Sequence, residues 1–153
     1  MKHAANRSMH PFQGRRILIA STLLGGSTLR RILEPLGVET VCAVTREEAL
    51  DRVGEGVDLV VCSLRFDESR MLDLVAEVAA LRPDLPFVCC RVVDSDLPQA
   101  SLRAAFTAAG HLGAVAVIDF PELARSEGTG LAERDVRESV AIHLYGAPHA
   151  SMS

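Results

Sequence analysis

Short apolar runs alternate along the chain with amphipathic segments. The apolar runs predict strands at residues 16–20, 38–44, 59–62, 87–92 and 114–118. Between them apolar residues recur at helical spacing, which predicts helices at residues 27–36, 45–53, 68–81, 99–109 and 132–145. Strands that are apolar throughout are typical of parallel sheets covered on both faces. Five strand–helix repeats with right-handed crossovers therefore predict a three-layer α/β sandwich around a five-stranded parallel sheet.

Polar residues mark where these helices begin. Thr45 and Glu48 have the spacing of a capping box, which predicts the start of the second helix. Ser27 or Thr28 is expected to cap the first helix after a glycine turn. Residues 122–130 interrupt the alternation and predict an inserted, partly helical loop before the last helix.

The length of 153 residues suits one domain. Residues 1–14 and 146–153 have no periodic pattern, so we expect disordered tails there and one folded domain over residues 15–145. The last eight residues are too few for a DNA-binding or catalytic module. The protein is therefore expected to act by contact.

Charge and composition exclude several classes of protein. The formal net charge is −4, whereas nucleic-acid affinity comes largely from Lys and Arg that neutralise phosphates, so no nucleic-acid partner is expected. No apolar run approaches the roughly 20 residues needed to cross a bilayer, and the first residues hold no signal-peptide core. We therefore expect a cytoplasmic protein with no membrane partner.

The four cysteines are Cys42, Cys62, Cys89 and Cys90, and all lie inside apolar runs. Buried cysteine behaves as a small hydrophobic residue. No C-x-x-C pair occurs and no His stands at ligand spacing, so packing roles are expected, with no metal and no cofactor.

Several short motifs, taken in order, resemble the response-regulator receiver domain. The motifs are RRILIAS, EPLGVE, EEAL, DLVV, LRPDLPFV and IDFP, and the resemblance covers about residues 15–145. It implies a CheY-like (βα)5 domain with the flavodoxin-like fold and a role in bacterial two-component signal transduction. In that family the fourth helix, fifth strand and fifth helix form the usual partner and dimer surface.

The resemblance also implies a phosphorylation site beyond the carboxyl ends of the strands. Receivers carry an acidic pair after the first strand, an acceptor Asp after the third, a Ser or Thr after the fourth, and a Lys before Pro after the fifth. The matching positions in this chain hold Ala20 and Ser21 (or Ser21 and Thr22), Ser63, Arg91 (or Cys90) and Phe120. Every element of the site is substituted.

These substitutions remove the chemistry of an aspartyl phosphate. Lys2 is the only Lys among the 16 basic residues, and no Asp or Glu lies between Arg16 and Leu33, so a shifted alignment supplies neither the Lys nor the acidic pair. A divalent cation finds no charged oxygen ligands there. We therefore expect a stand-alone pseudo-receiver that is not an enzyme. It is expected to bind another signalling protein without phosphorylation and to be a possible homodimer.

Other roles for the residues of this edge stay open. A nucleophilic Ser63 needs an adjacent base, and no His lies near the carboxyl end of a strand. Asp67, Asp94 and Asp119 either gather a cation or are solvated turn residues. Arg91 either points inward to pair with Asp67 or Asp119, or points to solvent.

A competing hypothesis is a flavodoxin-like binder of phosphate or a nucleotide. Glycines and hydroxyls at a helix N-terminus present N–H groups that attract anions. The candidate residues for this site are Ser21, Thr22, Gly25, Gly26, Ser27 and Thr28. The alternative is a glycine turn that only precedes a capped helix.

Overall fold

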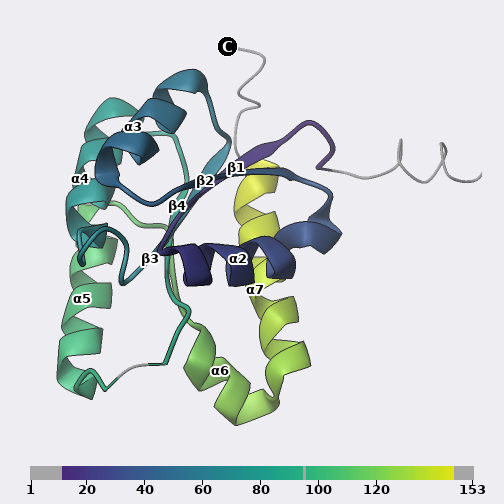
Figure 1. Cartoon of the computed structure of the whole chain (residues 1–153), viewed down its shortest axis with the longest axis vertical. Helices are drawn as coiled ribbons and strands as arrows, with labels where there is room; N and C mark the ends of the chain where they lie inside the picture. Colours follow the sequence, from purple (N-terminus) through teal and green to yellow (C-terminus); the bar gives the residue numbers. More distant parts are fainter. Residues whose placement is uncertain (1–11, 95, 147–153) are drawn as a thin grey trace, which may run out of the picture.

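The computed structural model describes residues 12–94 and 96–146 and contains one parallel sheet of order β2-β1-β3-β4-β5 (Figure 1). The strands are β1 (Arg16–Ala20), β2 (Glu39–Ala43), β3 (Leu59–Ser63), β4 (Phe87–Arg91) and β5 (Ala116–Asp119). The helices are α2 (Leu23–Leu33), α3 (Arg46–Glu55), α4 (Met71–Leu81), α5 (Gln99–Leu112), α6 (Phe120–Glu127) and α7 (Thr129–Gly146), with a 3-10 helix η1 (Glu34–Leu36). The predicted three-layer sandwich is confirmed.

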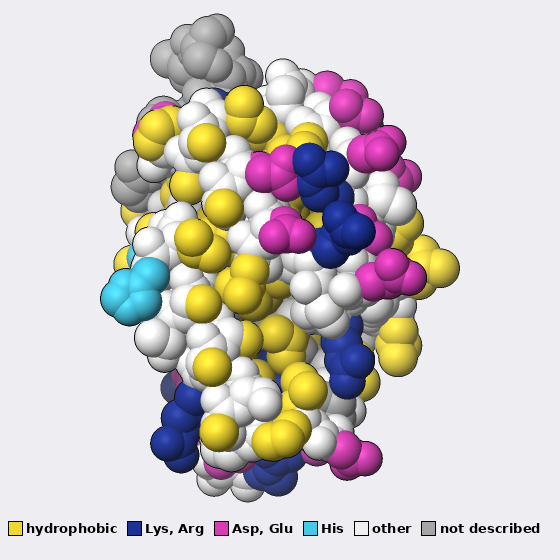
Figure 2. Space-filling model, turned by 90° about the vertical axis from the view of Figure 1, so that its left-hand side faces the viewer, with side chains coloured by type: hydrophobic (Ala, Val, Ile, Leu, Met, Phe, Trp, Pro, Cys, Tyr) yellow, Lys and Arg dark blue, Asp and Glu magenta, His cyan; other side chains and the backbone are white. Residues whose placement is uncertain are grey.

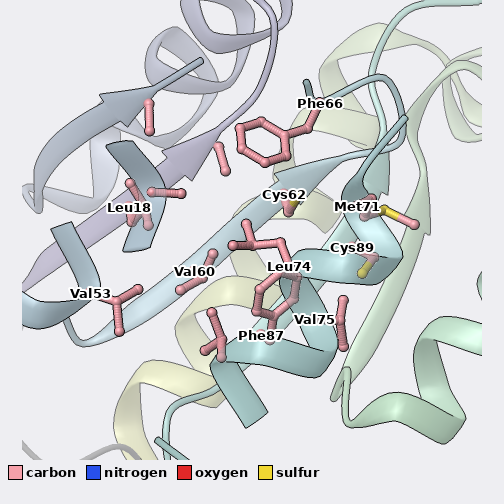
Figure 3. Close-up of a cluster of buried hydrophobic side chains, with 14 of the residues drawn as sticks. Leu18, Val53, Val60, Cys62, Phe66, Met71, Leu74, Val75, Phe87 and Cys89 are labelled. Atoms are coloured by element: carbon pink, nitrogen blue, oxygen red, sulfur yellow. The ribbon is translucent and has the colours of Figure 1, made fainter. Parts of the chain in front are cut away.

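Helices cover both faces of this sheet. Alternate residues of a strand point to opposite faces. In β3, Val60 and Cys62 pack with side chains of α3, α4 and α5, while Leu59 and Val61 pack with those of α2 and α7. Figure 3 shows the first of these two cores, in which Phe66 from the loop after β3 is fully buried. A sheet buried on two sides explains why its central strands are apolar throughout.

The capping box at the start of α3 is confirmed. The Thr45 hydroxyl accepts a hydrogen bond from the Glu48 N–H, and the Glu48 carboxylate accepts one from the Thr45 N–H. Hydrogen bonds that its carboxylate accepts from the Val44 N–H and then the Thr45 N–H hold the pKa of Glu48 below its ordinary value. The structure therefore begins α3 where the sequence pattern predicts it.

The sequence pattern predicts the wrong start for α4. The helix begins at Met71 and not at residue 68. Three successive residues before it have positive φ angles, and they are Asp67 (44°), Glu68 (56°) and Ser69 (69°). Left-handed backbone cannot continue a right-handed helix, so these residues form a turn.

The segment after β5 contains the predicted insertion. It forms the eight-residue helix α6, which the Asp119 carboxylate caps by accepting from the Glu122 N–H, and Gly128 then turns the chain into α7. Because α6 starts at Phe120, directly after β5, it reaches the carboxyl edge of the sheet. The insertion thus contributes residues to the site described below.

The prediction of an N-terminal tail is wrong for residues 12–14. Phe12 is 5% exposed and stacks edge-to-face on Tyr145 at the end of α7. Gly146, predicted as the first residue of the C-terminal tail, instead ends α7, and residues 1–11 and 147–153 of the predicted tails lie outside the described residues. Within the part of the chain that the structure describes, no helix is long and apolar enough to span a membrane.

Candidate functional site

Three adjacent strands bring the predicted site residues together. Ser21 follows β1, Ser63 ends β3 and Arg91 ends β4, and each of them is at most 5% exposed. Parallel neighbours end at the same edge of the sheet, so these side chains meet beyond its carboxyl ends. Ala20 instead packs in the core beneath α3 and α4, and Phe120 packs half-buried on the core beside α2 and α7.

The pair at the centre of the site is neutral. The Ser21 hydroxyl donates a buried hydrogen bond of 2.8 Å to the Ser63 hydroxyl. The partner of Ser63 is therefore another hydroxyl, which is not a base that activates a nucleophile. The pair satisfies both polar groups without bringing a charge into the site, and its role is structural.

Arg91 lies inside the site and joins an ion-pair network. One of its terminal nitrogens lies 3.1 Å from a carboxylate oxygen of Asp119, and the other lies 2.7 Å from a carboxylate oxygen of Asp94. Arg125 of α6 pairs with the other oxygen of Asp94 at 2.8 Å and with Glu122 at 2.8 Å. The network ties the end of β4 to the loop that follows it, to the end of β5 and to α6.

Of the open alternatives for Arg91, the structure selects the inward orientation with Asp119 as partner. Asp67 has a different role, because its carboxylate accepts a hydrogen bond of 2.8 Å from the Arg46 N–H at the start of α3. Asp94 and Asp119 face guanidinium groups. Over the described ranges, no group of three or more Asp, Glu, His or Cys side chains is arranged to hold a metal ion.

A cavity of about 20 Å³ remains in the site. It is lined by Ser21, Thr22, Gly25, Ser63, Leu64, Arg65, Arg91, Val92 and Val93. By the same measure a single water needs roughly 10–15 Å³, so the cavity holds about one water and not a phosphoryl group. The Ser21–Ser63 pair and Arg91 form part of the wall of this cavity.

The predicted glycine turn before the first helix is wrong. Thr22 caps α2 by accepting from the Gly25 N–H, so the helix begins at Leu23, four residues before Ser27. The Gly26 N–H donates 2.8 Å to the Thr22 carbonyl as an ordinary helical bond. Of the six candidate anion-binding residues, the last four (Gly25, Gly26, Ser27 and Thr28) lie inside the helix and form no loop around an anion.

Gly25 has a packing role that the sequence pattern did not reveal. A Cβ atom at this position would lie 2.4 Å from the Ser21 hydroxyl oxygen and 3.2 Å from that of Thr22. Only glycine lets α2 approach the serine pair this closely. Gly25 therefore allows the close packing of α2 on the Ser21–Ser63 pair, and it is not part of a phosphate-binding loop.

Three of the four cysteines have the predicted packing role. Burial raises the pKa of Cys89 to about 12 and raises those of Cys62 and Cys90 as well, so these thiols stay protonated. Cys42 contradicts the prediction because it is exposed on the edge strand β2. Its sulfur accepts a hydrogen bond of 3.2 Å from Arg30, beside a groove of about 190 Å³ between β2 and α2.

Solved structures of response regulators resemble this chain. A CheY-like receiver domain protein from Methanospirillum hungatei JF-1 matches with a TM-score of 0.65 at 22% identity, over 85% of this chain and 93% of that one. A putative response regulator from Chloroflexus aurantiacus J-10-fl matches with a TM-score of 0.67 at 19% identity, over 86% and 98%. An orphan response regulator of H. pylori matches with a TM-score of 0.61 at 15% identity, over 88% and 99%. No family model matches the chain, and no curated protein does.

The strand order and these likenesses establish the class of fold. The chain has the flavodoxin-like α/β fold of CheY-like receiver domains, as the sequence motifs predict. Identities of 14–22% to these structures establish the fold alone and not the chemistry of the site.

Proposed function

We propose that this protein is a pseudo-receiver, a bacterial signalling module that binds another signalling protein without being phosphorylated. The observation that carries the proposal is the buried Arg91 network, which occupies the carboxyl edge of the sheet together with the serine pair. The site offers no carboxylate to accept a phosphoryl group at the position of Ser63. On this proposal the protein is not an enzyme and works in the cytoplasm.

The network also links the elements that surround the site. A phosphoryl group acts by adding about 1.5 to 2 negative charges and three strong acceptors, which draw donors toward it. Here the Arg91 guanidinium already faces two carboxylates, those of Asp94 and Asp119. These ion pairs link Asp94, the end of β5 and α6 with no phosphoryl group present.

The surface of α5 and β5 supports an action by contact. A groove of about 400 Å³ runs between these elements, and its lining includes Phe106, His111, Val115 and Val117. Val115 and Val117 are 48% and 43% exposed. Figure 2, viewed from the side of α4 and α5, shows hydrophobic side chains spread over the middle of this side of the molecule, with charged side chains mainly along the right and lower borders. Such surfaces mark contacts with other proteins.

The test is a titration with beryllofluoride or acetyl phosphate and Mg²⁺, followed by amide NMR of the full chain. We expect no saturable shift of the amides of Ser21, Ser63 and Arg91, while a receiver with an intact acidic site, run in parallel, shifts. Saturable shifts centred on Ser63 would contradict the proposal. Intact mass measured after acetyl phosphate treatment gives the same answer independently, because a covalent phosphoryl group adds mass.

A further inference from the structure

The loop between β3 and α4 contains a run of left-handed backbone. Its residues Asp67, Glu68 and Ser69 have φ angles of 44°, 56° and 69°. This region is disfavoured at non-glycine residues, and it normally occurs as single residues and not in a run. Here the Arg70 N–H also donates 2.8 Å to the Phe66 carbonyl and closes the turn. Backbone of this kind persists only where the surrounding contacts maintain it.

The carboxylate of Asp67 ties this turn to the start of α3. It accepts a hydrogen bond of 2.8 Å from the Arg46 N–H. The side chains of Glu68 and Ser69, by contrast, are exposed. The contact between Asp67 and α3 therefore holds the left-handed turn in place.

The same segment has the makings of a right-handed turn. Helical turns of the two hands are mirror images, so the buried ends, Phe66 and Met71, can stay equally far apart. The hydrogen bond between Arg70 and Phe66 joins residues four apart, which is the spacing of an α-helical turn. Asp67 and Glu68 would then lie in the first turn of α4, where the helix dipole favours carboxylates. A right-handed turn therefore relieves the backbone and lengthens α4.

We propose that residues 67–70 are a two-state switch between this left-handed turn and a right-handed turn that extends α4. The two states exclude each other, because the right-handed turn takes the Asp67 carboxylate away from the Arg46 N–H. The contact with α3 favours the first state, and the backbone favours the second. A partner that binds one state better than the other shifts the balance between them.

The switch forms one wall of a polar pocket between the start of α3 and the loop. The pocket has a volume of about 360 Å³ and is lined by Thr45, Arg46, Glu47, Asp67, Glu68 and Arg70. The last three of these residues belong to the switch, so each state presents a different arrangement of charges to a partner. The inference goes beyond the proposed function and holds whether or not the protein is phosphorylated.

Four variants separate the two states. Glu68→Gly removes the penalty for a positive φ and should lock the left-handed turn. Glu68→Pro fixes φ at about −65° and should exclude that turn, with proline at the first position of the longer helix. Asp67→Ala should switch the turn by removing the contact with α3. Asp67→Asn is its matched control, because the amide oxygen can still accept from the Arg46 N–H, and it should keep the wild-type state.

Amide NMR of the full chain measures the state. The helical hydrogen bonds of α4 begin at the Leu74 N–H, which donates 3.0 Å to the Arg70 carbonyl. A longer α4 gives the N–H groups of residues 71–73 helical partners, so their hydrogen exchange should slow by roughly tenfold or more in Asp67→Ala and Glu68→Pro. Helical NOEs from residue 68 to residue 71 should appear in these two variants and not in the wild type or Glu68→Gly. An Asp67→Ala variant that exchanges like the wild type, or a Glu68→Pro variant that does not fold by circular dichroism, overturns the proposal.

Discussion

At the scale of the residue, a single buried arginine determines the charge balance of the site. Arg91 is 5% exposed and faces two carboxylates, of which Asp119 is largely shielded while Asp94 is exposed. Burying a guanidinium is costly unless carboxylates compensate its charge, so the three side chains stabilise the fold only as a set. The neutral Ser21–Ser63 pair beside them adds no charge to this balance.

Replacing Arg91 by Ala should therefore destabilise the protein markedly. Breaking a buried pair leaves a carboxylate without its partner and a cavity behind it, and we expect a loss of about 3 kcal/mol in the free energy of unfolding. Urea denaturation followed by circular dichroism measures it. The matched control is Arg125→Ala, which removes the exposed member of the same network and should cost less than about 1 kcal/mol. Equal losses for the two variants would argue against a central role for Arg91.

The two adjacent glycines of α2 provide a second test at this scale. Gly25→Ala places a methyl group against the Ser21 hydroxyl and should destabilise by about 1–3 kcal/mol. Gly26→Ala meets nothing within 4 Å and should stabilise by roughly 0.5–1 kcal/mol, since alanine favours a helix interior. Thermal unfolding compares the two. Adding Ser21→Ala should relieve the Gly25→Ala variant, and a failure to do so would place the clash elsewhere.

At the scale of the element, the corner between α6 and α7 brings two carboxyl groups together. The pKa of Glu127 is raised above its ordinary value of 4.5, first by its hydrogen bond with Asp135, then by burial and by the charge of Asp135. A carboxyl with a raised pKa in the folded state favours folding while it is protonated. That contribution is lost as the pH rises through the ordinary value to the raised one.

Glu127→Gln should therefore raise the melting temperature at neutral pH, because the amide keeps a hydrogen bond to Asp135 and carries no charge. Below the ordinary pKa of Glu127 the gain should vanish, since the native side chain is then protonated as well. Melting curves from pH 3 to pH 8 provide the measurement, with Glu133→Gln, a member of the Arg31 ion pair, as the control expected to lose stability at neutral pH. A gain for Glu127→Gln that is constant across pH would contradict this explanation.

The whole molecule shows how far the sequence carries a prediction. Apolar runs and helical spacing predict the five strands and the helices between them. This succeeds because strands that are buried on both faces of a sheet need apolar residues at nearly every position. The start of α2 escaped prediction because Thr22, and not Ser27, accepts the capping hydrogen bond. The contribution of Arg125 escaped because its partner Asp94 lies 31 residues away in the chain. Only the assembled sheet edge brings these residues together.

The exposure of Cys42 illustrates the same limit for strands. Its neighbours in β2 are apolar, as in the central strands, but β2 lies at the edge of the sheet, where strand order decides burial. When apolar and polar residues alternate only weakly along a strand, the sequence alone does not distinguish an edge strand from a central one. The position of a strand in the sheet, which is a property of the whole fold, therefore determines which thiol meets solvent.

Thiol labelling measures which of the four cysteines are accessible to solvent in the native fold. In the native protein we expect one thiol, that of Cys42, to react rapidly with a disulfide reagent. Cys62, Cys89 and Cys90 are buried in the central strands β3 and β4, and their raised pKa values keep the reactive thiolate scarce, so they should react only when the fold opens. Cys42→Ser should abolish the fast phase, and Arg91→Ala should accelerate the slow one. A second fast thiol in the wild-type protein would mean that β3 or β4 opens without global unfolding.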